Sequence, residues 1–158
     1  MMKGDNILLT RIDNRLVHGQ VGVTWTKTIG ANLIVVCDEE AANDQLQQQL
    51  MTFTAKSSGV GIRFFTVDFT AQVIDNASPD QKIFLVVKTP ATVRALIEKG
   101  VHLKDINVGN MHFSNGKRAL TKKVYVDDQD MADLKFAAEH GSNVYCQDVP
   151  GDSIEKIQ

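Results

Sequence analysis

The sequence predicts a three-layer α/β/α fold with a mostly parallel sheet of about six or seven strands and helices on both faces. Short β-branched apolar runs alternate with segments of helical periodicity along all 158 residues. Several of these runs are apolar at consecutive positions, which is typical of strands covered on both faces. No proline- or serine-rich linker and no repeat interrupts the alternation, so residues 1–158 are expected to form a single domain.

The predicted strands are short runs rich in β-branched residues, bounded by polar or glycine-containing segments. They cover residues 7–10, 33–37, 62–66, 83–87, 106–108, 124–126 and 144–146. The second and fourth runs, Leu-Ile-Val-Val-Cys and Ile-Phe-Leu-Val-Val, contain no polar residue and are expected to be covered on both faces. Residues 150–158 follow the last run and are expected to be loosely attached.

The segments between these runs predict helices that each lay one apolar stripe on the sheet. The apolar positions are 21, 25 and 29, then 93, 96 and 97, and then 131, 134 and 138. Thr89-Pro90 is typical of a helix cap followed by a first-turn proline. Asp130 with Asp133 is expected to open the last helix, and Gly100 and Gly141 predict helix ends.

Composition excludes several classes of protein. Lys and Arg total 17 against 19 for Asp and Glu, so no overall positive field is available for nucleic acid. No apolar run approaches the roughly 20 residues of a membrane helix, and residues 1–6 lack the apolar region of a signal peptide, so a cytoplasmic location is expected. Cys37 and Cys146 lie away from any Cys or His cluster and are expected to be reduced and buried.

The segment after the first predicted strand carries the strongest chemical signal. Residues 11–21 read Arg-Ile-Asp-Asn-Arg-Leu-Val-His-Gly-Gln-Val, and ligands of parallel sheets bind at the carboxyl ends of the strands. If His18 and Gly19 start a helix, free backbone N–H groups and the positive helix end form an anion site. Arg11 or Arg15 can add a planar charged fork, so the segment predicts a phosphate or carboxylate site.

His18 is the predicted nucleophile of this site. Asp13 is expected to accept from one imidazole nitrogen and leave the other nitrogen free to attack, although the sequence does not say which nitrogen is which. His102 and His140 have no second metal ligand at helical spacing, and the chain contains no GxxxxGK[ST] motif. Neither a metal nor another cofactor is therefore expected.

A second polar segment follows the fifth predicted strand. Asn110 is expected to contact His18 or its phosphate, with His112 assisting, although Gly- and Asn-rich segments are first of all turn formers. Met111 and Phe113 are apolar residues in a polar segment. They either contact a partner protein or anchor the segment to the core.

Other interpretations of these residues stay open at this point. Charged residues after a strand are often simply solvated, and Asp13 can also satisfy loop amides. A receiver-like domain would require adjacent acidic residues after the first strand, where this chain has one. A Rossmann-type nucleotide binder would require GxGxxG in its first turn. A regulatory binding protein that has lost catalysis remains compatible with the sequence.

Residues 11–21, followed by Trp25, resemble the active-site signature of the IIB subunits of the mannose/fructose/sorbose family of the bacterial phosphoenolpyruvate-dependent sugar phosphotransferase system. The resemblance covers essentially the whole chain, because residues 106–112, Gly116-Lys117 and Val126-Asp127 also match. Mannose-type members usually carry two glycines where this chain has Gly109-Asn110. In this segment the chain is more similar to the N-acetylgalactosamine and galactosamine branch.

The resemblance implies a phosphoryl carrier. His18 would accept phosphate from a phosphohistidine on a IIA partner, on the ring nitrogen Nδ1, and pass it to a hexose or amino sugar held by the membrane subunits IIC and IID. It also implies an exposed His18, one antiparallel edge strand and peripheral association with the membrane permease. The site would comprise the matching residues Asp13, Arg15, Arg11, Asn14, Gly19 and Gln20. The oligomeric state is left open.

Overall fold

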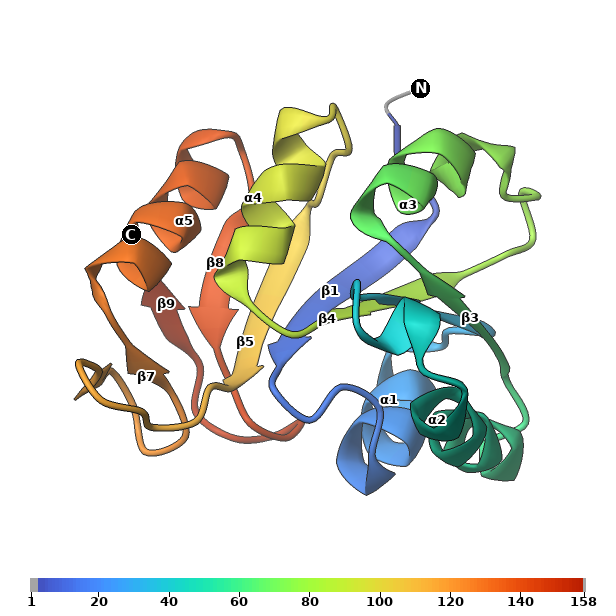
Figure 1. Cartoon of the computed structure of the whole chain (residues 1–158), viewed down its shortest axis with the longest axis horizontal. Helices are drawn as coiled ribbons and strands as arrows, with labels where there is room; N and C mark the ends of the chain where they lie inside the picture. The colour runs from blue at the N-terminus through green and yellow to red at the C-terminus, as the bar shows by residue number, and fades with distance from the viewer. Residues whose placement is uncertain (1–2, 158) are drawn as a thin grey trace.

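The structure is a computed structural model that describes residues 3–157, apart from the side chain of Gln20. Nine strands alternate with five α-helices in the described part of the chain (Figure 1). The strands are β1 (Ile7–Asp13), β2 (Leu33–Cys37), β3 (Gly61–Phe65), β4 (Ile83–Val87), β5 (Asp105–Asn110), β6 (Arg118–Ala119), β7 (Tyr125–Val126), β8 (Asn143–Cys146) and β9 (Glu155–Ile157). The α-helices are α1 (Thr26–Ile29), α2 (Gln45–Ser57), α3 (Val67–Val73), α4 (Pro90–Glu98) and α5 (Asp128–Glu139).

Seven strands form one sheet in the order β3-β2-β4-β1-β5-β8-β9. All neighbouring pairs are parallel except β8 and β9, which are antiparallel. The predicted mostly parallel sheet of six or seven strands is therefore confirmed. The predicted strand at 124–126 is different, because Tyr125–Val126 pairs with Arg118–Ala119 in a separate two-stranded sheet.

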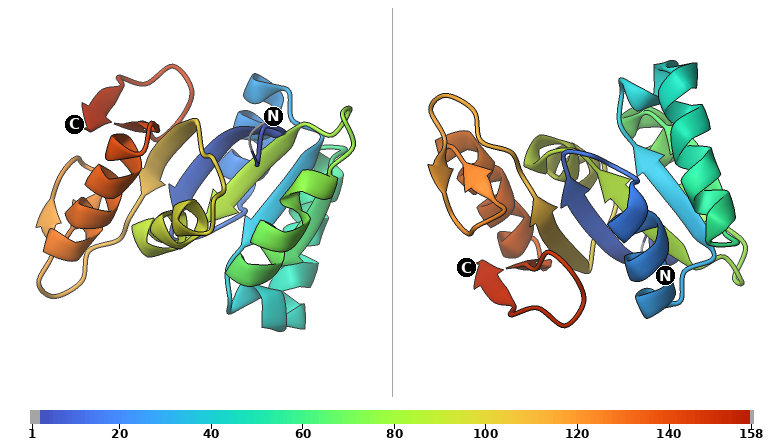
Figure 2. Two further views of the ribbon diagram at one scale, coloured as in Figure 1. Left: turned by 90° about the horizontal axis from the view of Figure 1, so that it is seen from above. Right: turned by 90° about the horizontal axis from the view of Figure 1, so that it is seen from below.

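Helices cover both faces of the large sheet, which confirms the three layers. On one face, α3, α4 and α5 pack on alternate residues of the strands and enclose the larger core. On the other face lie α2 and the segment that precedes α1, a π-helical turn labelled η1 (Gln20–Trp25). The strands change direction progressively across the sheet, a twist that Figure 2 shows from two sides.

Several predicted boundaries are correct and have a clear cause. The two wholly apolar runs form β2 and β4 at the predicted residues, and every position in them is buried. Thr89 is the N-cap of α4 with Pro90 at its first position. Gly100 and Gly141 follow α4 and α5 with φ of +90° and +96°, a conformation in which glycine has no steric cost.

Other predictions about the elements are wrong. Residues 150–158 were expected to be loosely attached, yet Glu155–Ile157 forms the edge strand β9 and Ile157 is buried. The helix α5 opens at Asp127, which forms a capping box with Asp130, and not at Asp130 with Asp133. Asp133 is instead buried in the second turn and pairs with Arg94. The periodicity analysis also missed α2 and α3.

β1 and β5 both run further than their apolar residues indicate. β1 continues through Arg11 and Asp13, and β5 continues through Gly109 and Asn110, all of which were expected in loops. Arg11 and Asp13 stay in the sheet because their charges pair with each other inside the fold. The strand extensions therefore carry the polar groups of the candidate site. None of the described helices has the length and apolar character needed to cross a membrane.

Candidate active site

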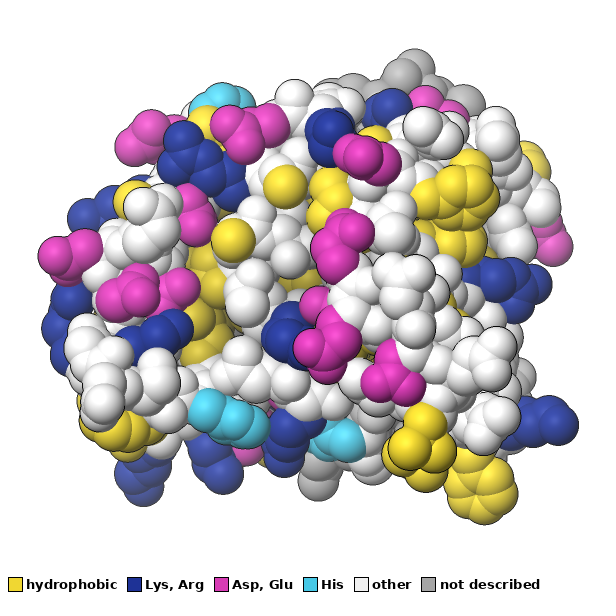
Figure 3. Space-filling model, in the orientation of Figure 1, with side chains coloured by type: hydrophobic (Ala, Val, Ile, Leu, Met, Phe, Trp, Pro, Cys, Tyr) yellow, Lys and Arg dark blue, Asp and Glu magenta, His cyan; other side chains and the backbone are white. Residues whose placement is uncertain are grey.

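The predicted site residues gather where β1 and β5 end, at the carboxyl edge of the sheet. Basic side chains and histidines lie along the lower edge of the molecule in Figure 3, the edge where these two strands end in Figure 1. The backbone N–H of Asn14 donates to the Asn110 carbonyl at 3.0 Å, so the two segments leave the sheet side by side. This position agrees with the general location of ligand sites in open parallel sheets.

A tight turn after β1 brings His18 back over Asp13. The N–H of Leu16 donates to the Asp13 carbonyl at 3.0 Å, and Leu16 has φ +57°, a left-handed conformation that is uncommon for a branched apolar residue. Leu16 and the following Val17 are buried in the core, and their burial holds the strained turn. The helix starts directly after His18, whose carbonyl accepts from the Gly22 N–H at 2.7 Å.

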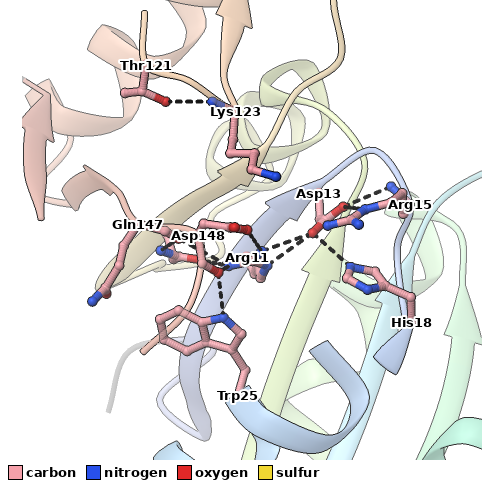
Figure 4. A network of polar contacts seen from close by, with 10 residues as sticks. Arg11, Asp13, Arg15, His18, Trp25, Thr121, Lys123, Gln147 and Asp148 are labelled. Atoms are coloured by element: carbon pink, nitrogen blue, oxygen red, sulfur yellow. Dashed lines mark hydrogen bonds and ion pairs between the residues drawn. The ribbon is translucent and has the colours of Figure 1, made fainter. Parts of the chain in front are cut away.

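Asp13 and His18 form the centre of the site (Figure 4). The Nε2 atom of His18 lies 3.1 Å from Oδ2 of Asp13, whose side chain is fully buried, while the His18 side chain is 21% exposed. Burial raises the pKa of Asp13, but hydrogen bonds from His18 and the Arg15 amide, together with the charge of Arg11, outweigh it and lower the pKa to about 2. The carboxylate is therefore ionised and favours a proton on Nε2 of His18.

Nδ1 of His18 has no hydrogen-bond partner among the side chains and backbone groups that the structure describes. A carboxylate that holds one imidazole nitrogen as its N–H fixes the tautomer and leaves a lone pair on the other nitrogen. The arrangement therefore presents Nδ1 as the nucleophilic atom, the nitrogen that the sequence alone left open.

Arg11 lies beneath the site and not at its surface. Its side chain is fully buried and its Nε and Nη2 donate to Oδ2 of Asp13 at 3.3 and 3.1 Å. Burial lowers the pKa of the Arg11 guanidinium, and the charge of Asp13 opposes this effect. Of the two arginines that were expected to offer a charged fork to an anion, Arg11 is not placed to do so, because its donors are turned toward protein acceptors. Its contribution to the site is to hold Asp13.

Arg15 is the exposed arginine of the site. Its N–H donates to Oδ1 of Asp13 at 2.9 Å, and its Nε lies 3.4 Å from the same oxygen. The side chain is 42% exposed, so it can meet an anion that approaches His18. Gly19 is exposed at the helix start with open space where a Cβ would lie. The side chain of Gln20 lies outside the described residues.

Asn14 ties three strand ends together. Its Nδ2 donates to the Lys88 carbonyl at 3.1 Å, beyond β4, and its Oδ1 accepts from the His112 N–H, beyond β5. Asn14 therefore supports the shape of the site. The structure gives no hydrogen bond from Asn110 or His112 to His18 within its described residues, and the alternative contact of Asn110 with a phosphate on His18 stays a prediction.

Asn110 and its neighbours divide between core and surface. Asn110 is buried, and its Oδ1 has no hydrogen-bond partner among the described residues. Met111 is also buried, so it anchors the segment to the core. Phe113 is exposed and packs edge-on against Tyr125 with ring centroids 5.5 Å apart. Of the two apolar residues, Phe113 is the one whose side chain lies at the surface.

Sequence reasoning missed the residues from β5, the segment after β8 and η1 that surround the Arg11 guanidinium. Nη1 of Arg11 donates to Oδ1 of Asn107 at 2.6 Å and to the carbonyls of Gln147 and Asp148 at 3.2 and 2.9 Å. Trp25 Nε1 donates to the same Asp148 carbonyl at 3.0 Å. The available signal was the polar Asn107 inside an otherwise apolar run, Ile-Asn-Val, at residues 106–108.

A pocket of about 390 Å³ lies on the β8 side of the residues that surround Arg11, and His18 does not line it. Its lining includes Gln147 and Asp148, together with the basic residues Lys122 and Lys123 and the acidic residues Asp152 and Glu155. The His18 imidazole thus lies outside the pocket, on a turn where its side chain is partly exposed. The described residues contain no cluster of three His, Cys, Asp or Glu side chains that could hold a metal ion.

Comparisons with known proteins agree on one family. Residues 7–158 match the family described as PTS system sorbose subfamily IIB component. The chain is 64% identical to the N-acetylgalactosamine-specific phosphotransferase enzyme IIB component 1 of Escherichia coli K12 over 99% of both chains. It is 45% identical to component 2 of the same strain over 92% of both chains. The crystal structure of the E. coli component 1 matches with a TM-score of 0.94 and covers 96% of this chain and 99% of that chain.

Proposed function

The chain belongs to the sorbose-subfamily IIB components of the phosphotransferase system, and from this premise we propose that His18 is the residue that carries the phosphoryl group. The protein is thus a phosphotransferase and a phosphotransfer subunit of sugar transport. Because the chain belongs to this family, the receiver-like and Rossmann-type interpretations no longer apply. The observation that carries the proposal is the contact of 3.1 Å between His18 Nε2 and the buried carboxylate of Asp13.

The first transfer step forms a P–N bond on Nδ1 of His18. The lone pair of Nδ1 attacks phosphorus while the P–N bond of the donor phosphohistidine breaks, and the donor imidazole keeps that electron pair. The proton on Nε2 stays in place, so positive charge develops on the His18 ring. The Asp13 carboxylate stabilises this charge at 3.1 Å.

Arg15 and the helix start supply the charge that the phosphoryl oxygens require. Arg15 shares the Asp13 carboxylate with His18, which supports a position for its guanidinium beside the transferred group. The backbone N–H groups that follow His18 open a helix, and such groups favour anions. Gly19 leaves space there for the phosphoryl group or the partner. In the second step a sugar hydroxyl attacks phosphorus and releases its proton to solvent, while the Nδ1–P bond breaks and its electron pair returns to the His18 imidazole.

We infer that the donor is a IIA subunit or domain and that the acceptor is a sugar bound by the membrane subunits IIC and IID, as the family implies. The partly exposed His18 supports this inference, because both partners must reach the same nitrogen. Peripheral association with the permease follows from the second transfer. We further propose that residues 1–158 act as a single IIB unit and that no cofactor takes part.

Phosphorylation of the intact protein tests the role of His18. Wild type, His18→Gln and His140→Gln would be incubated with phosphoenolpyruvate, the general phosphotransferase proteins and a cognate IIA, then measured by intact mass at alkaline pH. His140 caps the far end of α5 and serves as the matched control. Wild type and His140→Gln should gain one acid-labile phosphoryl group, and His18→Gln none. ¹⁵N NMR of the product should place the group on Nδ1.

Two results would overturn the carrier role. Phosphorylation of His18→Gln would move the acceptor to another residue. No phosphorylation of the wild type by a IIA that is active on another IIB would leave the chain as a regulatory binding protein.

We propose that the sugar belongs to the N-acetylgalactosamine and galactosamine branch. The support is the 64% identity to an E. coli protein that is named for N-acetylgalactosamine. Membranes that contain the IIC and IID of an N-acetylgalactosamine system should phosphorylate that sugar when this chain and IIA are added. Membranes that contain mannose-type IIC and IID serve as the control. Equal activity with both membranes would contradict the assignment.

A further inference from the structure

Asn107 is a buried polar residue in the middle of β5, and both ends of its amide are occupied. Its Oδ1 accepts from Nη1 of Arg11 at 2.6 Å, and its Nδ2 donates to the Gln147 carbonyl at 2.9 Å. A buried amide of this kind costs free energy unless every polar atom is paired. Because both atoms are paired here, the position of Asn107 is fixed from the β8 side as well as from its own strand.

Gly109 has no side chain, and the Arg11 guanidinium occupies the space that a side chain would fill. A Cβ at Gly109 would lie 2.0 Å from Cζ of Arg11 and 2.3 and 2.4 Å from its two terminal nitrogens. Alternate residues of a strand share one face, so Asn107 and Gly109 both lie against Arg11. The Arg11 Cζ lies 5.3 Å from the centroid of the Trp25 ring. Arg11 is thus enclosed by β5 and an aromatic ring.

This enclosure sets the direction of the Arg11 donors. With Nη1 on Asn107, the Nε and Nη2 edge of the planar guanidinium is turned to Oδ2 of Asp13. The same oxygen accepts from Nε2 of His18 at 3.1 Å. A contact chain therefore runs from Asn107 through Arg11 and Asp13 to His18, although the Asn107 side chain has no hydrogen bond with His18 itself among the described residues.

We propose that Asn107 is a positioning residue for phosphoryl transfer: by orienting Arg11 it fixes the Asp13 carboxylate, which keeps the proton of His18 on Nε2 and the lone pair on Nδ1. The inference rests on the proposed carrier role of His18. The short contact of 2.6 Å makes Asn107 the firmest of the acceptors around Nη1. Without it, Nη1 keeps only the carbonyls of Gln147 and Asp148, at 3.2 and 2.9 Å, and the guanidinium is held less firmly against Asp13.

Asn107→Leu is the direct test, because leucine keeps the approximate volume and removes both polar ends. Long-range ¹H–¹⁵N NMR of the unphosphorylated protein measures the tautomer of His18 without any transfer reaction. The wild type should be almost entirely the Nε2–H tautomer, and Asn107→Leu should show a mixture. The rate of transfer from phospho-IIA, per folded molecule, should fall about 10- to 100-fold, the cost of a small misplacement of a reacting group.

Two further variants separate positioning from folding. Asn107→Asp keeps an oxygen acceptor for Arg11 and should retain the Nε2–H tautomer, and Gly109→Ala should disturb the tautomer by displacing Arg11. The matched control is Asn143→Leu, which removes an exposed amide at the other end of β8. It should leave the tautomer and the rate unchanged. Should Asn107→Leu fail to fold, the comparison of Asn107→Asp with Gly109→Ala decides the question.

A purely structural role would look different. A folded Asn107→Leu with a lowered unfolding temperature but a wild-type tautomer and rate would overturn the inference. The carrier role fails separately, because it predicts phosphorylation and not a tautomer. If phospho-IIA fails to phosphorylate the wild type while the tautomer is still shifted in Asn107→Leu, the carrier role is overturned. The link between Asn107 and transfer then falls with it, and the contact chain stands.

Discussion

Asp13 divides its two carboxylate oxygens between two tasks. Oδ1 accepts from the backbone N–H of Arg15 and holds the turn, while Oδ2 accepts from Arg11 and His18 and holds the imidazole ring. A buried carboxylate without such partners would be protonated or would destabilise the fold. The same contacts that keep Asp13 ionised therefore also set the tautomer of His18.

Replacement of Arg15 by Ala should slow transfer far more than it destabilises the protein. The Arg15 side chain is partly exposed, and exposed ion pairs contribute about 0–1 kcal/mol to the free energy of unfolding. The loss of one group that stabilises transition-state charge costs about 10²- to 10³-fold in rate. The rate of phosphoryl transfer from phospho-IIA measures the first effect, and urea unfolding measures the second. Arg15→Lys, which keeps the charge without the fork, should be intermediate; a stability loss that accounts for the whole rate loss would contradict the assignment.

Asp13 should make the stability of the protein depend on acid pH. Its pKa is lowered from 3.8 to about 2 in the folded state, so its stabilising contribution is complete above pH 3.8 and is lost as the pH falls through about 2. This shift corresponds to about 2 kcal/mol. Urea unfolding of wild type and Asp13→Asn at pH 5 and pH 2 should give a stability difference that is smaller at pH 2 by about that amount. A difference that does not change with pH would show that Asp13 is not ionised through its contacts.

At the scale of elements, α2 explains why periodicity failed to predict a helix. Its buried residues are only Met51 and Ala55, whereas Leu46, Leu50 and Phe53 point outward and are 65–75% exposed. Figure 3 shows hydrophobic side chains that project over α2 at the lower right of the molecule. With apolar residues on two faces, the helix lacks the single apolar stripe by which amphipathic helices are recognised. Its start is fixed by Asp44, whose side chain accepts from the N–H groups of two residues in the first turn.

Adjacent substitutions on α2 should have very different effects on stability. Leu50→Gln should change the free energy of unfolding by less than about 0.5 kcal/mol, because the side chain is mostly exposed. Met51→Ala should lower it by about 2–5 kcal/mol, because it opens a cavity in the core between α2 and the sheet. Chemical denaturation of both variants measures the difference. Similar losses would mean that the outward face of α2 is covered in solution.

At the scale of the whole molecule, one sheet runs through both halves of the fold, β3-β2-β4 on one side of β1 and β5-β8-β9 on the other. β1 lies between β4 and β5, so the strand that leads to His18 contacts both halves. Cys37 lies in β2 on one side and Cys146 in β8 on the other, and both are buried free thiols, as expected. Burial raises the pKa of each thiol to about 11. Both groups are therefore protected from reaction while the sheet is intact.

Thiol labelling tests whether the two halves open together. Alkylation of the folded protein at neutral pH should be slow at both Cys37 and Cys146, and the two protection free energies should agree with the global free energy of unfolding. Single variants Cys37→Ala and Cys146→Ala allow each site to be followed by mass spectrometry. A lower protection at Cys146 than at Cys37 would show that the β8 and β9 half opens independently, against the proposal of a single unit.

The layers and the central strands follow from the sequence, which also singles out His18 as the candidate nucleophile. β2 and β4 were predictable to the residue because a strand covered on both faces must be apolar at every position, which is a local property. His18 stood out because titratable and cationic residues cluster within a few positions of a strand end. The resemblance of residues 11–21 to a family signature then indicated the reaction, and the comparisons agree with it.

Which arginine is buried, and which residues it contacts, could be learned only from the three-dimensional fold. Arg11 was indistinguishable from Arg15 in the sequence, but it is buried and faces Asn107, which is 96 residues away along the chain. Gly109 was expected to form a turn, yet it lies in β5 and makes room for that arginine. The physical reason is the separation along the chain of the residues involved. The burial pattern of a strand can be recognised from neighbouring residues, whereas a buried charge is stable only where distant segments bring its partners together.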